Sequence, residues 1–345
     1  MKKYNLTVIF VLFTFFVFAQ DEADHYAKLK GYNTDYRVNY FDKIIGQLEF
    51  NTELENFYIP RLFSNQEANV SIVPNQVLKM KFSIDYKFLG LNFAISPSFL
   101  PGNKYNPQKG NTETLDFSFK FFYSDKLRQE VTFKKIKGFY LEDFNTGETL
   151  EILPTLEIST YGGKTFYIIN KNFSYRSFET MTERQIKSNG SLVPSISYYY
   201  SELQNDQNYV SNSNLAKIKS FDFNFQTGYM HNFVYKKRWF TTLGFHPGIG
   251  FNKSSNYYLS LTDTDPIKTS TLNVNFNIDL NIALGYNNKN LFIGLRSNFR
   301  NSNLNDNSNK IQNNRTSFGI YTGYRFNEKK SIKKAFQFIE RKLKL

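Results

Sequence analysis

Residues 272–285 read LNVNFNIDLNIALG and alternate strictly between apolar and other side chains. One face of this stretch carries Leu272, Val274, Phe276, Ile278, Leu280, Ile282 and Leu284, and the other carries mostly Asn and Asp. Because successive side chains of a β-strand point to opposite faces, the pattern predicts a strand with one apolar and one polar face. Its 14 residues exceed the roughly 5–6 of a typical soluble strand. A tilted strand needs only about 9–11 residues to cross a bilayer.

The same alternation recurs along the chain. It is found in residues 78–86, 91–96, 115–121, 221–226, 243–251, 291–300 and 318–326. A soluble β-sandwich would also alternate, with its apolar face packed inward. Sandwich strands are short, so the length of these stretches favours a barrel that spans a membrane, with apolar residues facing lipid and polar residues facing the lumen.

The connections between these stretches differ in length in a regular order. Polar stretches near 99–112, 142–163, 204–218, 253–269 and 302–314 are long, and those near 87–89, 124–128, 233–237 and 286–290 are short. Outer-membrane barrels have long outer loops and short periplasmic turns. With a tight outer turn at Pro74-Asn75 and an inner turn near 180–185, the pattern predicts a transmembrane antiparallel barrel of about 12 strands (10–14) over residues 63–326. Residues 20–62 are then a periplasmic lead-in or a first hairpin.

Composition agrees with this fold class. The 345 residues include 37 Phe, 24 Tyr and 1 Trp, yet the mean hydropathy is −0.48. A bundle of membrane-spanning helices would be far more apolar, and a disordered chain would be poor in aromatic residues. The chain has no cysteine, which excludes disulfides, thiolate metal sites and a lipid-bearing N-terminal Cys.

The N-terminus predicts export. Lys2 and Lys3 precede an apolar stretch from Val8 to Phe18, and Val17-Phe18-Ala19 supplies small or tolerated residues at the cleavage positions. This pattern is typical of a signal peptide over residues 1–19 that is cleaved after Ala19. The alternative is a single membrane anchor, for which the apolar stretch is short. The formal net charge of +13 would favour nucleic acid in a cytoplasmic protein, but export removes that partner.

Residues 327–345 form a distinct basic tail. Ile332, Phe336, Ile339 and Leu343 follow helical spacing, which predicts a short C-terminal amphipathic helix. The tail carries seven Lys or Arg against Glu328 and Glu340. It is expected either to lie on anionic headgroups of the membrane or to dock a periplasmic protein, and a solubilising cap under the barrel is the plain alternative.

Several sequence blocks resemble a known family. They are residues 154–168, 172–176, 182–191 and 198–200, with Val73-Pro74-Asn75 and residues 137–141. Together these blocks resemble an exported Bacteroidota family described only as a domain of unknown function, over most of residues 35–326. The resemblance implies an outer-membrane-type barrel. It brings no activity and no site residues.

Two motifs with possible chemistry are weak. Gly163-Lys164-Thr165 looks like the end of a phosphate loop, but Ile158 stands where that signature needs a glycine. His25, His231 and His246 form no close pair, so neither a metal site nor a cofactor is predicted. His246 has inward parity, and an enzyme that modifies lipids would need it beside a serine. No partner serine can be identified, so catalysis is not the favoured interpretation.

The inward faces carry the candidate site residues. The candidates that should line the lumen are Lys79, Lys81, Asp85, Asp116, Lys120, Asp222, His246, Asp279, Arg296, Arg300 and Arg325. A second cluster near the predicted inner turn, at the periplasmic mouth, is Tyr175, Arg176, Glu183, Arg184, Gln185 and Lys187. Buried charges must be paired or hydrated. They therefore indicate either a narrow channel or binding cavity for small polar solutes, or a closed interior whose ion pairs hold together a structural or interaction barrel.

Overall fold

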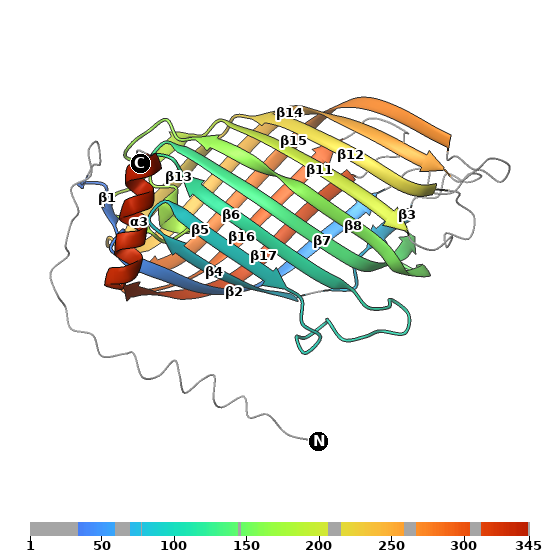
Figure 1. The fold of residues 1–345 in the computed structure, drawn as a ribbon, viewed down its shortest axis with the longest axis horizontal. Coiled ribbons are helices and arrows are strands. Elements are labelled where there is room, and N and C mark those ends of the chain that lie inside the picture. Colours follow the sequence, from blue (N-terminus) through green and yellow to red (C-terminus); the bar gives the residue numbers. More distant parts are fainter. Residues whose placement is uncertain are drawn as a thin grey trace, which may run out of the picture.

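The computed structural model describes residues 34–58, 70–76, 78–143, 146–205, 215–258, 267–303 and 312–343. The predicted signal peptide, residues 1–19, lies outside these residues. Figure 1 shows one long barrel of tilted strands, with the helix α3 (Lys330–Leu343) set across one end. None of the described helices is long and apolar enough to cross a bilayer.

Among the described residues, twelve strands form a closed antiparallel ring, which confirms the predicted fold. They are β2 (Lys43–Tyr58), β4 (Leu78–Tyr86), β5 (Leu89–Ile95), β6 (Glu113–Phe122), β7 (Leu127–Asp143), β8 (Thr149–Tyr167), β11 (Ser195–Asn205), β12 (Leu215–Gln226), β14 (Trp239–Tyr258), β15 (Ile267–Asn287), β16 (Leu291–Asn303) and β17 (Gln312–Asn327). The ring closes because β17 pairs with β2 from Asn327↔Lys43 to Gln312↔Tyr58. The barrel thus begins at Lys43, and the expected start at residue 63 was too late.

Shorter elements complete the wall at both ends. They are β1 (Arg37–Asn39), β3 (Val70–Val73), α2 (Arg176–Glu179), β9 (Glu183–Gln185), β10 (Asn189–Leu192) and β13 (Tyr229–Tyr235). β3 pairs with both β2 and β7, so one strand replaces β4, β5 and β6 in the wall at that end. At the opposite end, which we call the turn end, β10 pairs with β13 and β13 pairs with β14.

The apolar side chains of the alternating strands lie on the exterior of the barrel. On β15, Leu272, Val274 and Phe276 are all more than 60% exposed, while Asn275 and Asn277 on the other face are buried. Exposed apolar side chains recur on the other strands, as on Phe82, Phe245 and Ile320. A continuous apolar exterior over a polar interior is the arrangement that a bilayer requires of a spanning barrel.

The expected long loop at 142–163 is wrong. β7 ends at Asp143 and β8 begins at Thr149, and the two strands are paired along almost their whole length. Here the polarity of the two faces is reversed, because the apolar residues Leu153, Leu156 and Ile158 point inward and are buried. Outside, Lys135 pairs with Glu157 at 2.8 Å. Charged outward faces belong in water, so this hairpin continues the barrel beyond the bilayer.

Candidate functional site

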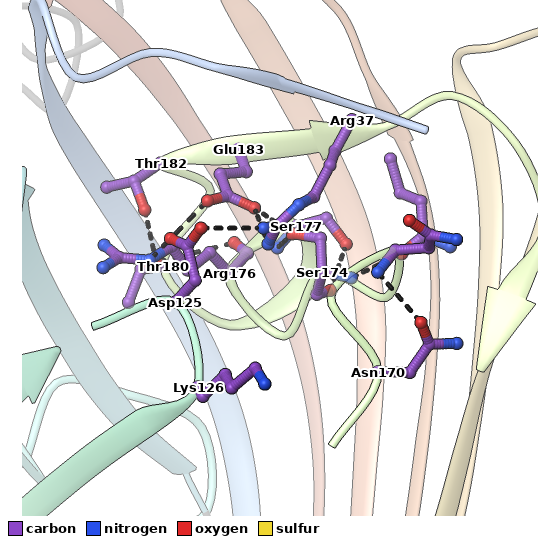
Figure 2. Close-up of polar contacts among 12 residues, drawn as sticks. Arg37, Asp125, Lys126, Asn170, Ser174, Arg176, Ser177, Thr180, Thr182 and Glu183 are labelled. Atoms are coloured by element: carbon purple, nitrogen blue, oxygen red, sulfur yellow. Dashed lines mark hydrogen bonds and ion pairs between the residues drawn. The ribbon is translucent and has the colours of Figure 1, made fainter. Parts of the chain in front are cut away.

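The turn end of the barrel is filled by residues 168–194, which we call the plug. The sequence predicted only a tight inner turn near 180–185. Instead, this segment leaves β8, forms α2 and β9, and returns to the wall as β10. β9 pairs with β1 across the end, from Arg37↔Gln185 to Asn39↔Glu183. Figure 2 shows the polar side chains of the plug gathered around this pair.

Glu183 is the centre of the plug's hydrogen-bond network. Its carboxylate is fully buried and accepts a bond of 2.6 Å from the Ser174 hydroxyl. The Arg37 guanidinium lies 3.3 Å from it and also binds Asp125 at 2.9 Å (Figure 2). Arg176 lies 3.7 Å from the second oxygen. Because Asp125 belongs to the β6–β7 turn, the network ties the plug to the barrel wall.

Arg325 fixes the plug from β17. Its Nε and Nη2 donate to the carbonyl of Met181 at 2.9 and 2.7 Å, and Nη2 also donates to the Asn287 side chain at 2.8 Å. Met181 has a φ of +55°, a left-handed conformation that costs free energy for a non-glycine residue. The predicted role of Arg325 in lining the lumen is therefore wrong, because its guanidinium is hydrogen-bonded to the backbone of the plug.

Apolar side chains pack around this network. The plug contributes Phe173, Phe178 and Met181, and the wall contributes residues including Ile45, Phe240 and Phe292, all at most 8% exposed. Interiors packed in this way leave few voids larger than a water molecule. The turn end is therefore closed by protein, and the predicted cluster at the periplasmic mouth is a seal. Tyr175, Arg176, Glu183, Arg184 and Gln185 are buried within it, and only Lys187 is exposed.

Beyond the plug, the middle of the lumen holds a charged cavity of about 340 Å³. Tyr175 and Glu179 of the plug contribute to its lining. Of the predicted lumen residues, Lys79, Lys81, Asp116, Asp222, His246, Asp279, Arg296 and Arg300 line it. Asp85 and Lys120 do not line it but are buried in the wall beside it.

Two carboxylates of this cavity, Glu53 and Asp279, form ion pairs that cross the lumen. Glu53 on β2 contacts Lys79 at 2.7 Å, Lys134 at 2.8 Å and Arg315 at 2.5 Å. Since β4, β5 and β6 separate β2 from β7 in the ring, the bond to Lys134 crosses the lumen. A second crossing joins Lys164 on β8 to Asp279 on β15 at 3.1 Å, and Arg300 adds a bond of 2.9 Å to the same carboxylate. The middle of the lumen is thus narrowed by charged side chains.

Arg296 stands out among the cationic residues of the lining. Its Nε lies 3.6 Å from Glu49 and its Nη1 lies 3.9 Å from Glu179, and its guanidinium stacks 4.3 Å from the ring of Tyr321. The Nη2 atom is buried and has no hydrogen-bond partner among the described residues. An unsatisfied buried donor in a polar cavity is suited to bind an acceptor group of a solute.

Glu179 joins the plug to the cavity. Its carboxylate lies 2.7 Å from Lys120 and 3.5 Å from Arg128. Burial acts to raise the pKa of Glu179, but the attraction of Lys120, Arg128 and Arg296 outweighs it and holds that pKa well below its usual value. The carboxylate therefore remains ionised and keeps α2 fixed to the wall.

His246 faces the lumen, as its parity predicted. It is 3% exposed, and its Nδ1 has no hydrogen-bond partner among the described residues. His231 lies on β13 between the exposed rings of Tyr229 and Phe233, as expected for an interfacial ring.

Sequence reasoning missed some of the strongest members of this site. Glu49 and Glu53 lie on β2, in the segment that was predicted to be either a periplasmic lead-in or a first hairpin. Lys134 lies on β7, where alternation with Val131 and Phe133 could have revealed it. Lys164 was considered only as part of a phosphate loop, and it lies instead on the inward face of β8.

A closed antiparallel ring with an apolar exterior, a charged lumen and a sealed end defines this protein as a transmembrane β-barrel. The chain belongs to the family described as Domain of unknown function (DUF4421), which matches residues 32–326.

Comparisons with other known proteins add little to this. No curated protein sequence matches the chain. Among solved structures, the chain is similar to the outer membrane protease OmpT from Escherichia coli, with 8% identity, a TM-score of 0.41 and coverage of 86% of this chain and 100% of that one. It is also similar to the toluene transporter TbuX of Ralstonia pickettii, with 9% identity, a TM-score of 0.33 and coverage of 83% and 90%. For the β domain of the Bordetella autotransporter BrkA, the identity is 8%, the TM-score 0.37 and the coverage 82% and 99%. No site is carried over from these structures.

Proposed function

We propose that this protein is an outer-membrane barrel whose lumen binds a small polar solute and whose periplasmic end is closed by the plug. The signal-peptide pattern of residues 1–19 supports export. The β4–β5, β6–β7, β13–β14 and β15–β16 turns are short and lie at the plugged end, and outer-membrane barrels place their short turns in the periplasm. The source that the sequence resemblance implies, a Gram-negative member of the Bacteroidota, is part of this proposal.

The charged cavity is the observation that supports the proposed binding of a solute. Its volume of about 340 Å³ lies at the lower end of the range for small-molecule sites. Its lining combines charges of both signs with amide and hydroxyl side chains, and Arg296 offers a buried donor. A solute with a carboxylate, phosphate or hydroxyl group would satisfy that donor. Passage through the barrel would require the plug to move, so the protein acts as a binder or a gated channel and not as an open pore.

Thermal unfolding of the folded protein in detergent tests solute binding. The probes are inorganic phosphate, glutamate and glucose, which present a phosphate anion, an anionic amino acid with two carboxylates, and a neutral polyol. A solute present at about 100 times its dissociation constant stabilises the folded state by roughly 2.7 kcal/mol. We expect at least one probe to raise the unfolding temperature.

The matched variant is Arg296→Lys, which keeps the positive charge near Glu49 but removes the forked donors. It should abolish the stabilisation, whereas Lys217→Gln, which removes an exterior partner of Glu202, should retain it. If none of the probes shifts the unfolding temperature, solute binding is refuted.

A closed structural or interaction barrel is the second candidate. The ion pairs that cross the lumen favour it, because Lys134–Glu53 and Lys164–Asp279 each join strands that are four places apart in the ring. This candidate predicts no stabilisation by any small solute and a loss of stability when either bridge is removed. The lipid-modifying enzyme has the least support, because His246 faces the lumen while acyl chains contact the exterior.

A further inference from the structure

The turn end carries a basic amphipathic helix, α3, that has no role in the proposed binding of a solute in the lumen. α3 begins soon after β17 and runs crosswise to the strands, along the end of the barrel (Figure 1). Phe336 packs edge-on against Tyr86 at 4.6 Å and lies 5.5 Å from Phe88. Lys87 binds Glu340 at 2.9 Å, and Glu328 accepts a hydrogen bond from Tyr86. These contacts fix α3 to the β4–β5 turn, in the plane where the spanning strands end.

One side of α3 is anchored, and the other is exposed with an unusual composition. Phe338, two residues after Phe336 and thus on the opposite side of the helix, is 66% exposed. Residues three and four positions apart are neighbours on a helix surface, so Lys334, Arg341 and Lys342 surround Phe338. All three are exposed. An aromatic ring among cations is the surface with which an interfacial helix enters a headgroup layer.

The β13–β14 turn, at the same end of the barrel, has the same character. Tyr235 and Trp239 are 64% and 51% exposed, and the exposed cations Lys236, Lys237 and Arg238 lie between them. Tyr and Trp gather at the level of the headgroups in membrane proteins. α3 and this turn together give the turn end a basic and aromatic rim.

We propose that α3 and this rim bind anionic phospholipid headgroups of the leaflet at the turn end. The helix lies parallel to the membrane plane, and its charge is complementary to an anionic surface, to which each nearby Lys or Arg adds attraction. A protein partner is the weaker occupant, because a few exposed apolar side chains on one short helix offer much less than the about 1,200–2,000 Å² of a stable protein interface.

The test places a fluorescent reporter on the helix of the full chain. Trp239 is the only tryptophan, so Phe338→Trp in a Trp239→Phe background reports on α3 alone. The protein is folded into vesicles of phosphatidylcholine, with or without phosphatidylglycerol. In the anionic vesicles, we expect a blue-shifted emission, protection from acrylamide and quenching by brominated phosphatidylglycerol.

Charge variants and a control at the opposite end complete the experiment. Lys334→Glu and Lys342→Glu should each lower the docked-to-undocked ratio of the helix by roughly fivefold or more, since one basic residue contributes roughly 1 kcal/mol at an anionic surface. Phe99→Trp in the same background, at an exposed position near β5, should show no dependence on lipid. If the reporter on α3 remains equally exposed to water in both kinds of vesicle, lipid binding is refuted and a protein partner becomes the explanation. Solute binding in the lumen is not involved in either outcome.

Discussion

The plug and the cavity occupy the same barrel, and both contain buried polar and charged side chains, yet they differ in how those side chains are satisfied. At the plug, Glu183 and the wall residue Arg325 bind plug atoms and are enclosed by apolar side chains. In the cavity, Glu53 and Asp279 face a polar space and bridge across it. The difference teaches that inward charge alone does not distinguish a seal from a site. The deciding property is whether apolar residues of another segment exclude water around it.

The largest expected effect comes from breaking the plug's network. Glu183→Gln leaves Arg37 and Arg176 beside a neutral amide in a dry environment. Removing one partner of a buried ion pair typically costs about 3–5 kcal/mol. Urea titration of the folded protein should show a loss of this size in the free energy of unfolding. A loss below about 1 kcal/mol would mean that water reaches the plug.

The same chemical change in the cavity should cost less. Asp279→Asn removes the carboxylate shared by Lys164 and Arg300, but the cavity allows water to hydrate both cations. We expect a loss of about 1–3 kcal/mol in the same titration. If this loss equals or exceeds that of Glu183→Gln, the contrast between a dry plug and a wet cavity is wrong.

Acid should act on the junction between the two regions. Because the pKa of Glu179 is held well below its unfolded value, its contribution to stability is complete above about pH 5 and disappears as the pH falls through the folded pKa. The stability gap between the native protein and Glu179→Gln should therefore be constant near neutrality and close in acid. Urea titrations of both proteins over a pH series measure the gap. A gap that widens in acid would contradict the assigned ionisation.

The smallest effect is expected on the outer surface of the turn end. Lys87 and Glu340 form a partly exposed ion pair between the β4–β5 turn and α3. Exposed pairs are typically worth about 0–1 kcal/mol. Glu340→Gln should therefore leave the urea midpoint nearly unchanged. A loss comparable to that of Asp279→Asn would show that α3 is part of the plug's packing.

The sequence was sufficient to predict the barrel because lipid imposes strict alternation of apolar and polar residues on the wall strands that span the bilayer. Residues 272–285 show this most clearly, and the short turns at 87–89 and 286–290 were placed correctly. The rule fails where lipid is absent. Leu153 and Leu156 point inward in the part of β8 beyond the bilayer, so their hairpin was mistaken for a loop. β2 lies in residues 20–62, which the sequence left open between a periplasmic lead-in and a first hairpin.

The candidate site was only partly predictable for a related reason. Parity places Lys79, Asp279 and Arg296 inside the barrel, but it cannot show which of them meet across the lumen. The plug lacks long alternation, since its residues pack as a compact insertion and not as a wall. Its polar block around Glu183 was recognised, but the apolar residues Phe173 and Met181 that make it a seal gave no periodic signal.

The most direct test of the plugged lumen is conductance in planar bilayers. The native protein is compared with a variant in which residues 170–190 are replaced by a short Gly-Ser linker, and the folding of both is checked first by circular dichroism. We predict that the native protein shows no steady conductance and that the folded variant without the plug conducts ions. A steady conductance from the native protein, or a folded variant that remains silent, would contradict the claim that the plug closes the barrel.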